Sequence, residues 1–307
     1  MKSSGLGCLL ILAALNPAFA MERSPCPFCC GATAAGSILN VAHAGASSLA
    51  PQNTLAAGRA AFAAGADVWG VDARRTRDGV FVLMHDETLA RTTNVEEVFP
   101  ARSPWRVADF LLSEIRSLDA GSWFVQEDPF DQVAQGNVSA DALRAYVGEP
   151  VPTLREALEF VAANDGWIDI EIKAPLEIEP ETVAAELLVL LRKTGTADCA
   201  LVSSFDRGFL VEVRHLAPTL PIGALTVLPL PDPLETLRSL GVAVYLPSVV
   251  GFTDALLEDL EQGGIPVIVW TYNTADQLEY ALDLPGIDGI YTDFPQRLAA
   301  LLEERTP

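Results

Sequence analysis

The sequence predicts an α/β protein built as a (β/α)8 barrel, that is, a TIM barrel. The chain has 307 residues, 50% of them hydrophobic, which is enough for one large core of barrel size. After about residue 150, short apolar runs alternate with amphipathic helical patterns, as parallel strands and crossover helices do. No glycine-rich phosphate loop follows the first strand, and this disfavours the alternative, a doubly wound open sheet.

Eight apolar runs are predicted as the parallel strands of this barrel. They are residues 38–44, 68–75, 167–173, 200–205, 222–227, 242–247, 266–273 and 289–294. The predicted helices are 54–66, 153–163, 180–193, 207–216, 233–240, 253–262 and 274–284. Each helix is long enough to carry the chain back across the sheet to the next parallel strand.

Two segments depart from this alternation. Asp78-Gly79 marks a tight turn after the second strand, and the run at 80–85 returns at once. No crossover helix fits between them, so residues 80–85 are predicted as an antiparallel hairpin extension outside the barrel. Residues 87–150 are polar and punctuated by proline and glycine, which predicts an insertion capping the barrel mouth.

The first twenty residues have the features of a secretory signal peptide. Lys2 supplies the positive charge, residues 6–15 the apolar core and Ala18-Phe19-Ala20 the small-residue cleavage pattern. The apolar run is about half of the ~20 residues that a membrane span needs, so we expect removal and no stable membrane span. The protein is therefore expected to be exported, periplasmic or secreted. A translation start at Met21 is the alternative and would leave it cytosolic.

Residues 21–37 are predicted to be a flexible N-terminal segment, and residues 38–307 the barrel domain. The segment holds three cysteines, Cys26, Cys29 and Cys30. They could form a disulfide in an oxidising compartment, or lie in a tethered tail without one.

The formal charge of the chain is −21, from 41 acidic and 20 basic residues. A nucleic-acid partner is therefore not expected, because phosphate backbones are bound by basic surfaces. A phosphate-bearing small molecule would have to be received by a local positive feature such as a metal ion.

Polar side chains stand at the ends of the predicted strands. His43 and His85 each follow an apolar run, and Asp72 lies on the strand between them. On the strand at 167–173, alternation places three isoleucines on one face and Asp169, Glu171 and Lys173 on the other. In a barrel the isoleucines would pack on the helices, and the charged residues would line the lumen and its rim.

These motifs resemble those of the glycerophosphodiester phosphodiesterase family. That family has His-Arg-Gly, then Pro-Glu-Asn-Thr, Glu-x-Asp and His-Asp, and later Glu-x-Lys. The corresponding residues are His43-Ala44-Gly45, Pro51-Gln52-Asn53-Thr54, Gly70-Val71-Asp72, His85-Asp86 and Glu171-Ile172-Lys173. Further similar segments are residues 118–124, 152–154, 203–205, 270–273 and 292–295. The long, ordered match extends over most of the predicted barrel.

The resemblance implies metal-dependent hydrolysis of small glycerophosphodiesters to glycerol 3-phosphate and an alcohol. It implies that His43 and His85 are the general acid and base, in an order that the sequence leaves open. Asp72 and Glu171 would bind a divalent cation, Mg²⁺ or Ca²⁺. The substrate-binding residues would be Lys173 at the phosphate, together with Gln52, Trp270 and Phe205.

Three family residues are replaced. Ala44 stands for the arginine, Gln52 for the first glutamate and Gly70 for the second. One basic and two acidic groups are thereby lost. Water, Gln52 or Asp169 would have to complete the cation's ligands, and cation affinity is expected to be weaker.

Two other functions remain open. A catalytically impaired barrel that binds phospholipid headgroups would explain the replacements, whereas the retained histidines favour an enzyme. A lipase-like relative that cleaves lysophospholipids or sphingolipids at a membrane would need exposed apolar loops, and the polar insertion at 87–150 does not supply them.

Overall fold

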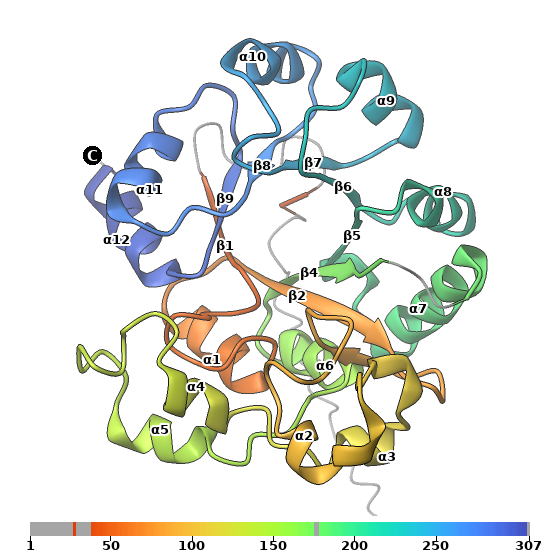
Figure 1. The fold of residues 1–307 in the computed structure, drawn as a ribbon. Coiled ribbons are helices and arrows are strands. Elements are labelled where there is room, and N and C mark those ends of the chain that lie inside the picture. The colour runs from red at the N-terminus through yellow and green to blue at the C-terminus, as the bar shows by residue number, and fades with distance from the viewer. Residues whose placement is uncertain (1–26, 29–37, 175–177, 306–307) are drawn as a thin grey trace, which may run out of the picture.

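The computed structural model describes residues 27–28, 38–174 and 178–305. They form a barrel of parallel strands surrounded by helices (Figure 1). The predicted signal peptide, the three clustered cysteines and most of the segment at 21–37 lie outside the described residues, so those expectations stay predictions. The predicted (β/α)8 fold is confirmed.

Eight parallel strands make the barrel, in the order β7-β6-β5-β4-β2-β1-β9-β8. Two isolated parallel bridges, Tyr245 to Val267 and Ser248 to Trp270, join β7 to β8 and complete the circle. The strands are β1 (Leu39–Ala42), β2 (Val68–Arg75), β4 (Trp167–Ile172), β5 (Ala200–Ser204), β6 (Ile222–Thr226), β7 (Val244–Pro247), β8 (Ile268–Val269) and β9 (Gly289–Thr292).

The helices that cover the barrel lie close to their predicted positions. They are α1 (Leu55–Ala63), α6 (Leu154–Ala163), α7 (Pro180–Thr194), α8 (Arg207–Leu216), α9 (Pro233–Leu240), α10 (Asp254–Gln262), α11 (Ala275–Leu282) and α12 (Pro295–Arg305). A short 3-10 helix, η3 (Ala197–Cys199), precedes β5. Side-chain caps fix several starts: Thr153 and Glu156 form a reciprocal capping box at α6, as Thr274 and Gln277 do at α11.

The first strand is shorter than predicted because the backbone turns sharply after His43. Ala44 has φ 53° and Gly45 φ 90°, both in the left-handed region. A Cβ on Gly45 would lie 2.6 Å from Cβ of Ala57, so only glycine fits there. The turn leaves the His43 side chain at the mouth of the barrel. β8 is also shorter than the predicted run of 266–273.

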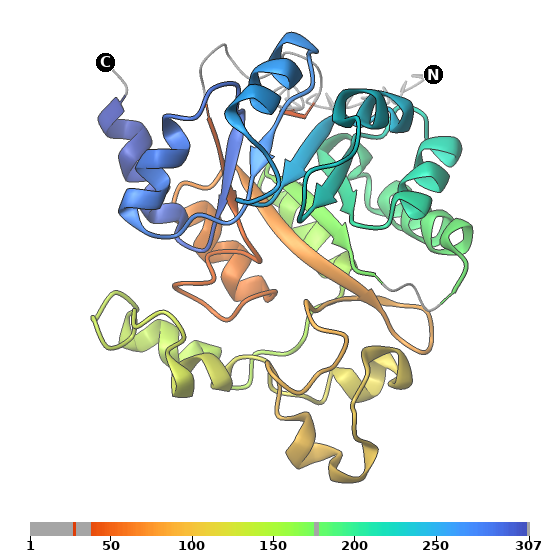
Figure 2. The same cartoon turned by 45° about the horizontal axis from the view of Figure 1, so that its top comes forward.

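The predicted hairpin extension is confirmed: β3 (Phe81–Leu83) pairs antiparallel with β2 and stays outside the barrel. The segment from 87 to 150 contains short helices and no strand. They are α2 (Val95–Val98), η1 (Pro100–Arg102), η2 (Val107–Asp109), α3 (Leu112–Ile115), α4 (Ser122–Glu127) and α5 (Ala140–Tyr146). Figure 2 shows them as a separate layer at the end toward which the strands point.

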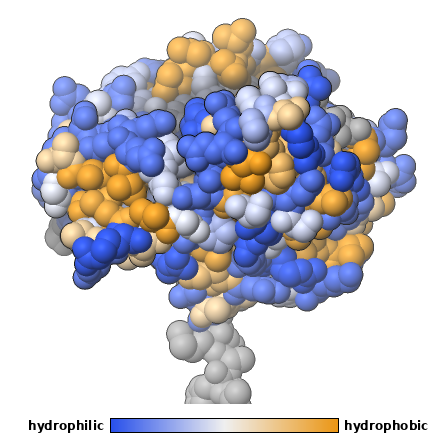
Figure 3. Space-filling view, turned by 60° about the horizontal axis from the view of Figure 1, so that its bottom comes forward, coloured by the Kyte–Doolittle hydropathy of each residue, from blue (hydrophilic) through white to orange (hydrophobic). Residues whose placement is uncertain are grey.

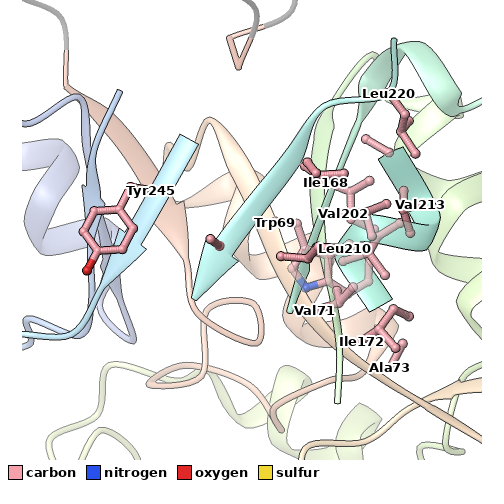
Figure 4. Packing of buried hydrophobic residues seen from close by; sticks show 14 of the residues in the cluster. Trp69, Val71, Ala73, Ile168, Ile172, Val202, Leu210, Val213, Leu220 and Tyr245 are labelled. Atoms are coloured by element: carbon pink, nitrogen blue, oxygen red, sulfur yellow. The ribbon is translucent and has the colours of Figure 1, made fainter. Parts of the chain in front are cut away.

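Two apolar layers hold the barrel. The larger lies between strands and helices and includes Ile168, Ile170 and Ile172, as the alternation of β4 predicted. In Figure 4 this layer continues through Trp69 and Val202 to side chains of α8. The smaller layer fills the lumen, where Val41, Val68, Leu201, Leu246 and Ile268 meet. Phe28 joins the lumen layer and packs edge-on against Trp167, with ring centroids 6.5 Å apart.

Within the described ranges, every helix is too short or too polar to span a lipid bilayer.

Candidate active site

A pocket opens at the carboxyl end of the strands. This is the end at which TIM-barrel enzymes carry their active sites. Every predicted site residue except Gln52 lines it. The lining residues are His43, Ala44, Gly70, Val71, Asp72, His85, Asp169, Glu171, Lys173, Phe205, Leu225, Trp270 and Tyr291. No residue of the 87–150 segment is among them, so the insertion adjoins the mouth without lining the pocket.

His43 is oriented by a carboxylate from the last strand's end. Its Nδ1 lies 2.8 Å from Oδ1 of Asp293, whose other oxygen accepts a hydrogen bond from Asn273 Nδ2 at 2.6 Å. Burial opposes the charged ring, but the negative charge and hydrogen bond of Asp293 outweigh it and raise the pKa of His43 to about 9. The ring is therefore an imidazolium at neutral pH, with Nε2 left for a substrate.

His85 has a carboxylate partner next to it in sequence. Its Nδ1 lies 2.8 Å from Oδ1 of Asp86, and Arg91 donates two hydrogen bonds to the same carboxylate, at 2.6 and 2.9 Å. The hydrogen bond from Arg91 is the main cause that lowers the pKa of Asp86 to about 2. Asp86 thus stays ionised and holds the imidazole in one orientation.

Asp72 is buried and doubly engaged by Asn53. The Asn53 amide donates to Asp72 Oδ2 at 2.7 Å and accepts from the Asp72 backbone N–H at 3.0 Å. Thr54 follows and caps α1, which fixes the turn carrying Asn53. Burial favours the neutral carboxyl, but Lys173 and the two histidines together hold the pKa of Asp72 well below its usual range.

Lys173 joins two carboxylates across the strands. Its Nζ lies 3.1 Å from Asp72 Oδ1 and 2.8 Å from Glu171 Oε1, and its side chain is buried. These residues come together because Asp72 and Glu171 are register partners on β2 and β4. Burial and the charge of Asp72 raise the pKa of Glu171 to about 7. The ammonium group is the main compensation for the negative charge of both.

Asp169 lies deeper in the same pocket. Its Oδ2 accepts hydrogen bonds from Ser203 Oγ at 3.1 Å and from the Tyr291 hydroxyl. Its Oδ1 is buried and has no hydrogen-bond partner. Burial is the main reason that the pKa of Asp169 rises to about 7.

A side chain at position 70 would be crowded by its neighbours in this chain. A Cβ at this position would lie 3.1 Å from Cε1 of Tyr291 and 3.2 Å from the Ala42 carbonyl oxygen. The ring of Tyr291 thus fills the space into which the family's glutamate would extend. Gly70 is the register partner of Asp169, so the nearest carboxylate is on the neighbouring strand.

The oxygen donors suit a hard divalent cation, and the unpartnered Asp169 Oδ1 is an unused ligand atom. Two carboxylates, Asp72 and Glu171, meet at Lys173. In the described part of the chain, no group of three or more histidine, cysteine, aspartate or glutamate side chains is arranged to hold a metal ion. The oxygen donors that the pocket offers to a cation are thus Asp72, Glu171 and Asp169, and the first two of these are paired with Lys173.

The opposite wall of the pocket is apolar. Phe205, Leu225 and Trp270 line it, and the rings of Phe205 and Trp270 meet edge-on with centroids 5.8 Å apart. Trp270 is anchored by a 2.8 Å hydrogen bond from Nε1 to the Leu246 carbonyl oxygen. A polar headgroup on the charged side would thus face a fixed aromatic surface.

The sequence analysis assigned no role to four residues that orient the site. Asn53, Asn273 and Asp293 lie in the segments that resemble the family, and Tyr291 lies in the last predicted strand. Asp293 directly follows the last strand, and this position marks it as a candidate site residue. The sequence pattern does not show that its side chain reaches His43. Gln52 is partly buried and lies outside the pocket lining, whereas its neighbour Asn53 contacts Asp72.

The sequence profile of the glycerophosphoryl diester phosphodiesterase family matches residues 43–297. The chain belongs to this family. The resemblance of its motifs and the prediction of a phosphoric diester hydrolase are thereby confirmed. Members of this family are generally dependent on a divalent metal.

Two bacterial relatives match over most of their length. A glycerophosphodiester phosphodiesterase of Caldanaerobacter subterraneus is 31% identical over 266 residues, covering 87% of this chain and 98% of that protein. One from Bacillus subtilis is 31% identical, covering 84% of each. The structure of an Oleispira antarctica phosphodiesterase in complex with the product sn-glycerol-3-phosphate has a TM-score of 0.71 and 26% identity, covering 86% of this chain and 96% of that one.

Proposed function

We propose that the protein hydrolyses glycerophosphodiesters to glycerol 3-phosphate and an alcohol. The observation that carries this proposal is the pairing of two carboxylate-oriented histidines with a buried Asp72–Lys173–Glu171 cluster in one pocket. A binding protein has no need of two oriented imidazoles. The product complex of the Oleispira antarctica relative supports the same class of substrate.

His43 is proposed as the general acid and His85 as the general base. Asp293 keeps His43 protonated at neutral pH, so its Nε2 has a proton to give to the leaving oxygen. His85, oriented through Nδ1 by Asp86, has Nε2 available to take a proton from the attacking hydroxyl group. The attacking group is water or the substrate's own glycerol hydroxyl.

Lys173 is proposed to bind the phosphate. Ala44 stands where the family has arginine, so the pocket lining contains Lys173 as its one Lys or Arg side chain. It would share its charge between the phosphate oxygens and the two carboxylates that now hold it. Phe205 and Trp270 would flank the alcohol, and Gln52 would make a polar contact to the substrate from outside the pocket lining.

A divalent cation, Mg²⁺ or Ca²⁺, is proposed at Asp72 and Glu171, with Asp169 Oδ1 as a further oxygen ligand. When bound, it would neutralise the diester and polarise phosphorus. The protein's own contribution is to hold these carboxylates fixed: Asn53 orients Asp72, and Ser203 and Tyr291 orient Asp169.

The alternative is a catalytically impaired barrel that binds headgroups, favoured by Ala44, Gln52 and Gly70. An assay separates the two: release of glycerol 3-phosphate from a panel of headgroups, with Mg²⁺, Ca²⁺ or a chelator. The enzyme predicts cation-stimulated release from at least one headgroup. Tight binding of the same compounds with no release under any of the three conditions would leave the binding protein standing.

Export is proposed for the whole chain because residues 1–20 carry the three parts of a secretory signal. Mass spectrometry of the protein expressed in a bacterial host tests this. A mature N-terminus at Met21 in the periplasmic or secreted fraction is expected. An intact N-terminus with all protein in the cytosol would contradict export.

A further inference from the structure

Arg91 is an exposed arginine whose carboxylate partner also holds a histidine of the site. Its Nε and Nη2 donate to the two oxygens of Asp86 at 2.6 and 2.9 Å, and Asp86 Oδ1 lies 2.8 Å from Nδ1 of His85. The turn that carries it is fixed, because buried Thr93 donates through Oγ1 to the Leu89 carbonyl oxygen at 2.6 Å. The guanidinium group therefore binds both carboxylate oxygens from a defined position.

An exposed arginine–carboxylate pair by itself indicates nothing about function in a chain with a formal charge of −21. Hydrophilic residues cover much of the face shown in Figure 3, and Arg106 pairs with Glu87 at 2.8 Å in the same part of the chain. Among the described residues, neither member of that pair contacts a histidine. Arg91 differs because its carboxylate partner is bound to His85 on the other side.

His43 has the same carboxylate support, with a neutral group in place of the arginine. Asn273 Nδ2 donates to Asp293 at 2.6 Å, and its side-chain oxygen accepts from the Asp293 backbone N–H at 2.9 Å. Arg297 Nη1 donates to the Asn273 backbone carbonyl oxygen at 2.8 Å and not to the carboxylate. Against the opposing effect of burial, the charge of Asp293 raises the pKa of His43 to about 9.

The backbones of the two histidines are held independently of these partners. His43 N donates to the Thr292 carbonyl oxygen at 2.9 Å, and the His85 carbonyl oxygen accepts from Arg74 Nε at 3.1 Å. The charge of Asp72 acts on both rings and so does not distinguish them. The other charged groups of the surrounding strands are Arg74, Glu171 and Lys173. The main difference between the two rings is thus the group behind each carboxylate.

We propose that Asn273 and Arg91 are positioning residues that assign the two proton transfers to the two histidines. Asn273 is neutral and leaves the charge of its carboxylate partner acting on His43. Arg91 offsets the charge of its own carboxylate partner, which then orients His85 without holding a proton on it. This inference rests on the proposed function. The attacking hydroxyl group gives its proton to His85 Nε2 as its oxygen bonds to phosphorus, and the leaving oxygen takes a proton from His43 Nε2 as its bond to phosphorus breaks.

The acid side is tested with two diesters of glycerol phosphate that differ in the leaving group. One carries the alkyl headgroup hydrolysed fastest in the headgroup panel, whose alcohol needs a proton in order to leave. The other carries p-nitrophenol, which leaves as the phenolate without one. Asn273→Ala should lower kcat about tenfold or more for the alkyl diester and much less for the p-nitrophenyl diester. Asn273→Ser is a second variant with the same expected result. Equal losses on both diesters would overturn the role of Asn273.

The base side is tested by separating the charge of Arg91 from its hydrogen bonds. Arg91→Gln removes the charge and should lower kcat about 3–10-fold at pH 7 for both diesters, because the attacking group is the same in each. Arg91→Lys keeps the charge and should recover most of that loss. Arg106→Gln is the matched control, because it breaks a similar pair that contacts no histidine. Its kcat should equal that of the wild type.

The results that would overturn the role of Arg91 are specific. Arg91→Lys as slow as Arg91→Gln would show that its charge is not what matters, and a normal kcat in Arg91→Gln would show that it has no role. A loss in Arg91→Gln confined to the alkyl diester would place the arginine on the acid side and overturn the assignment. A wild type that hydrolyses neither diester would contradict the proposed function itself.

Discussion

One wall of the pocket, formed by β1, β2 and β4, carries the ionisable groups, and the wall formed by β5, β6 and β8 carries the apolar ones. His43, Asp72, Glu171 and Lys173 belong to the first wall, as do Ala44 and Gly70, two of the three departures from the family. Phe205, Leu225 and Trp270 belong to the second wall. The comparison separates two proposed tasks: the charged wall would cleave the phosphodiester, and the apolar wall would contact its alcohol.

The charged wall should lose nearly all turnover when either histidine is removed. His43→Ala and His85→Ala should each lower kcat about 10²–10⁴-fold, because an acid or base is lost. His215→Ala is the control, since His215 is exposed on α8. Steady-state kinetics at saturating cation measures the effect. Near-normal turnover in either variant would remove that histidine from the mechanism.

The next largest effect is expected at Lys173. A charge-assisted contact contributes about 1.5–3 kcal/mol, so Lys173→Met should lower kcat/KM about 10–100-fold. Part of the loss should fall on kcat, because the contact strengthens as charge develops in the transition state. Exposed Lys193, on α7, serves as control through Lys193→Met. A change in KM alone would mean that Lys173 only binds the ground state.

Thermal unfolding of Lys173→Met measures how much the lysine stabilises the fold. Without the ammonium group, Asp72 and Glu171 lose their shared ion-pair partner. The variant should melt at a lower temperature at pH 8 and recover part of the difference at pH 5, where protonation of Glu171 relieves the repulsion. A melting temperature lowered by the same amount at pH 8 and at pH 5 would contradict this electrostatic cause.

Asp293→Asn should change the pH dependence of activity. The Asp293 carboxylate favours the imidazolium form of His43, whose pKa is raised to about 9. Removing that charge lowers the pKa, so an acid at His43 loses its proton at lower pH. The alkaline limb of the kcat/KM profile should therefore move toward neutrality. Asp283→Asn, at an exposed carboxylate, should leave the profile unchanged. An unmoved limb in Asp293→Asn would exclude His43 as the acid.

The smallest effect concerns the lost carboxylate at Gly70. Gly70→Glu alone should tighten cation binding by no more than a few-fold, because the new side chain meets the ring of Tyr291. Combining it with Tyr291→Ala opens that space and should tighten binding further. Calorimetric titration with Mg²⁺ and Ca²⁺ compares these variants with Tyr291→Ala alone. Equal cation affinities of Gly70→Glu and of the double variant would show that the Tyr291 ring does not limit cation binding by the new carboxylate.

The sequence alone was sufficient to predict the barrel, the hairpin extension and the face of β4 that carries Asp169, Glu171 and Lys173. These follow from period-two alternation and from the order of strands and helices, which are local properties. The ends of elements were less predictable: β1 ends early because Ala44 adopts a left-handed conformation that apolar periodicity does not reveal.

The partners of the site residues could not be predicted from local pattern. Asp293 is separated by 250 residues from His43, and only closure of the barrel brings them together. Tyr291 fills the space beside Gly70 for the same reason, since β9 lies against β1 and β1 against β2.

The most direct test of this account is a single-turnover assay with enzyme in excess over a glycerophosphodiester, run for the wild type, His43→Ala and His85→Ala with Mg²⁺ or Ca²⁺. The account predicts full conversion to glycerol 3-phosphate by the wild type and conversion slowed about 10²–10⁴-fold in both variants, with substrate still bound. If the wild type binds the substrate but does not convert it, with Mg²⁺ or with Ca²⁺ alike, the account is contradicted.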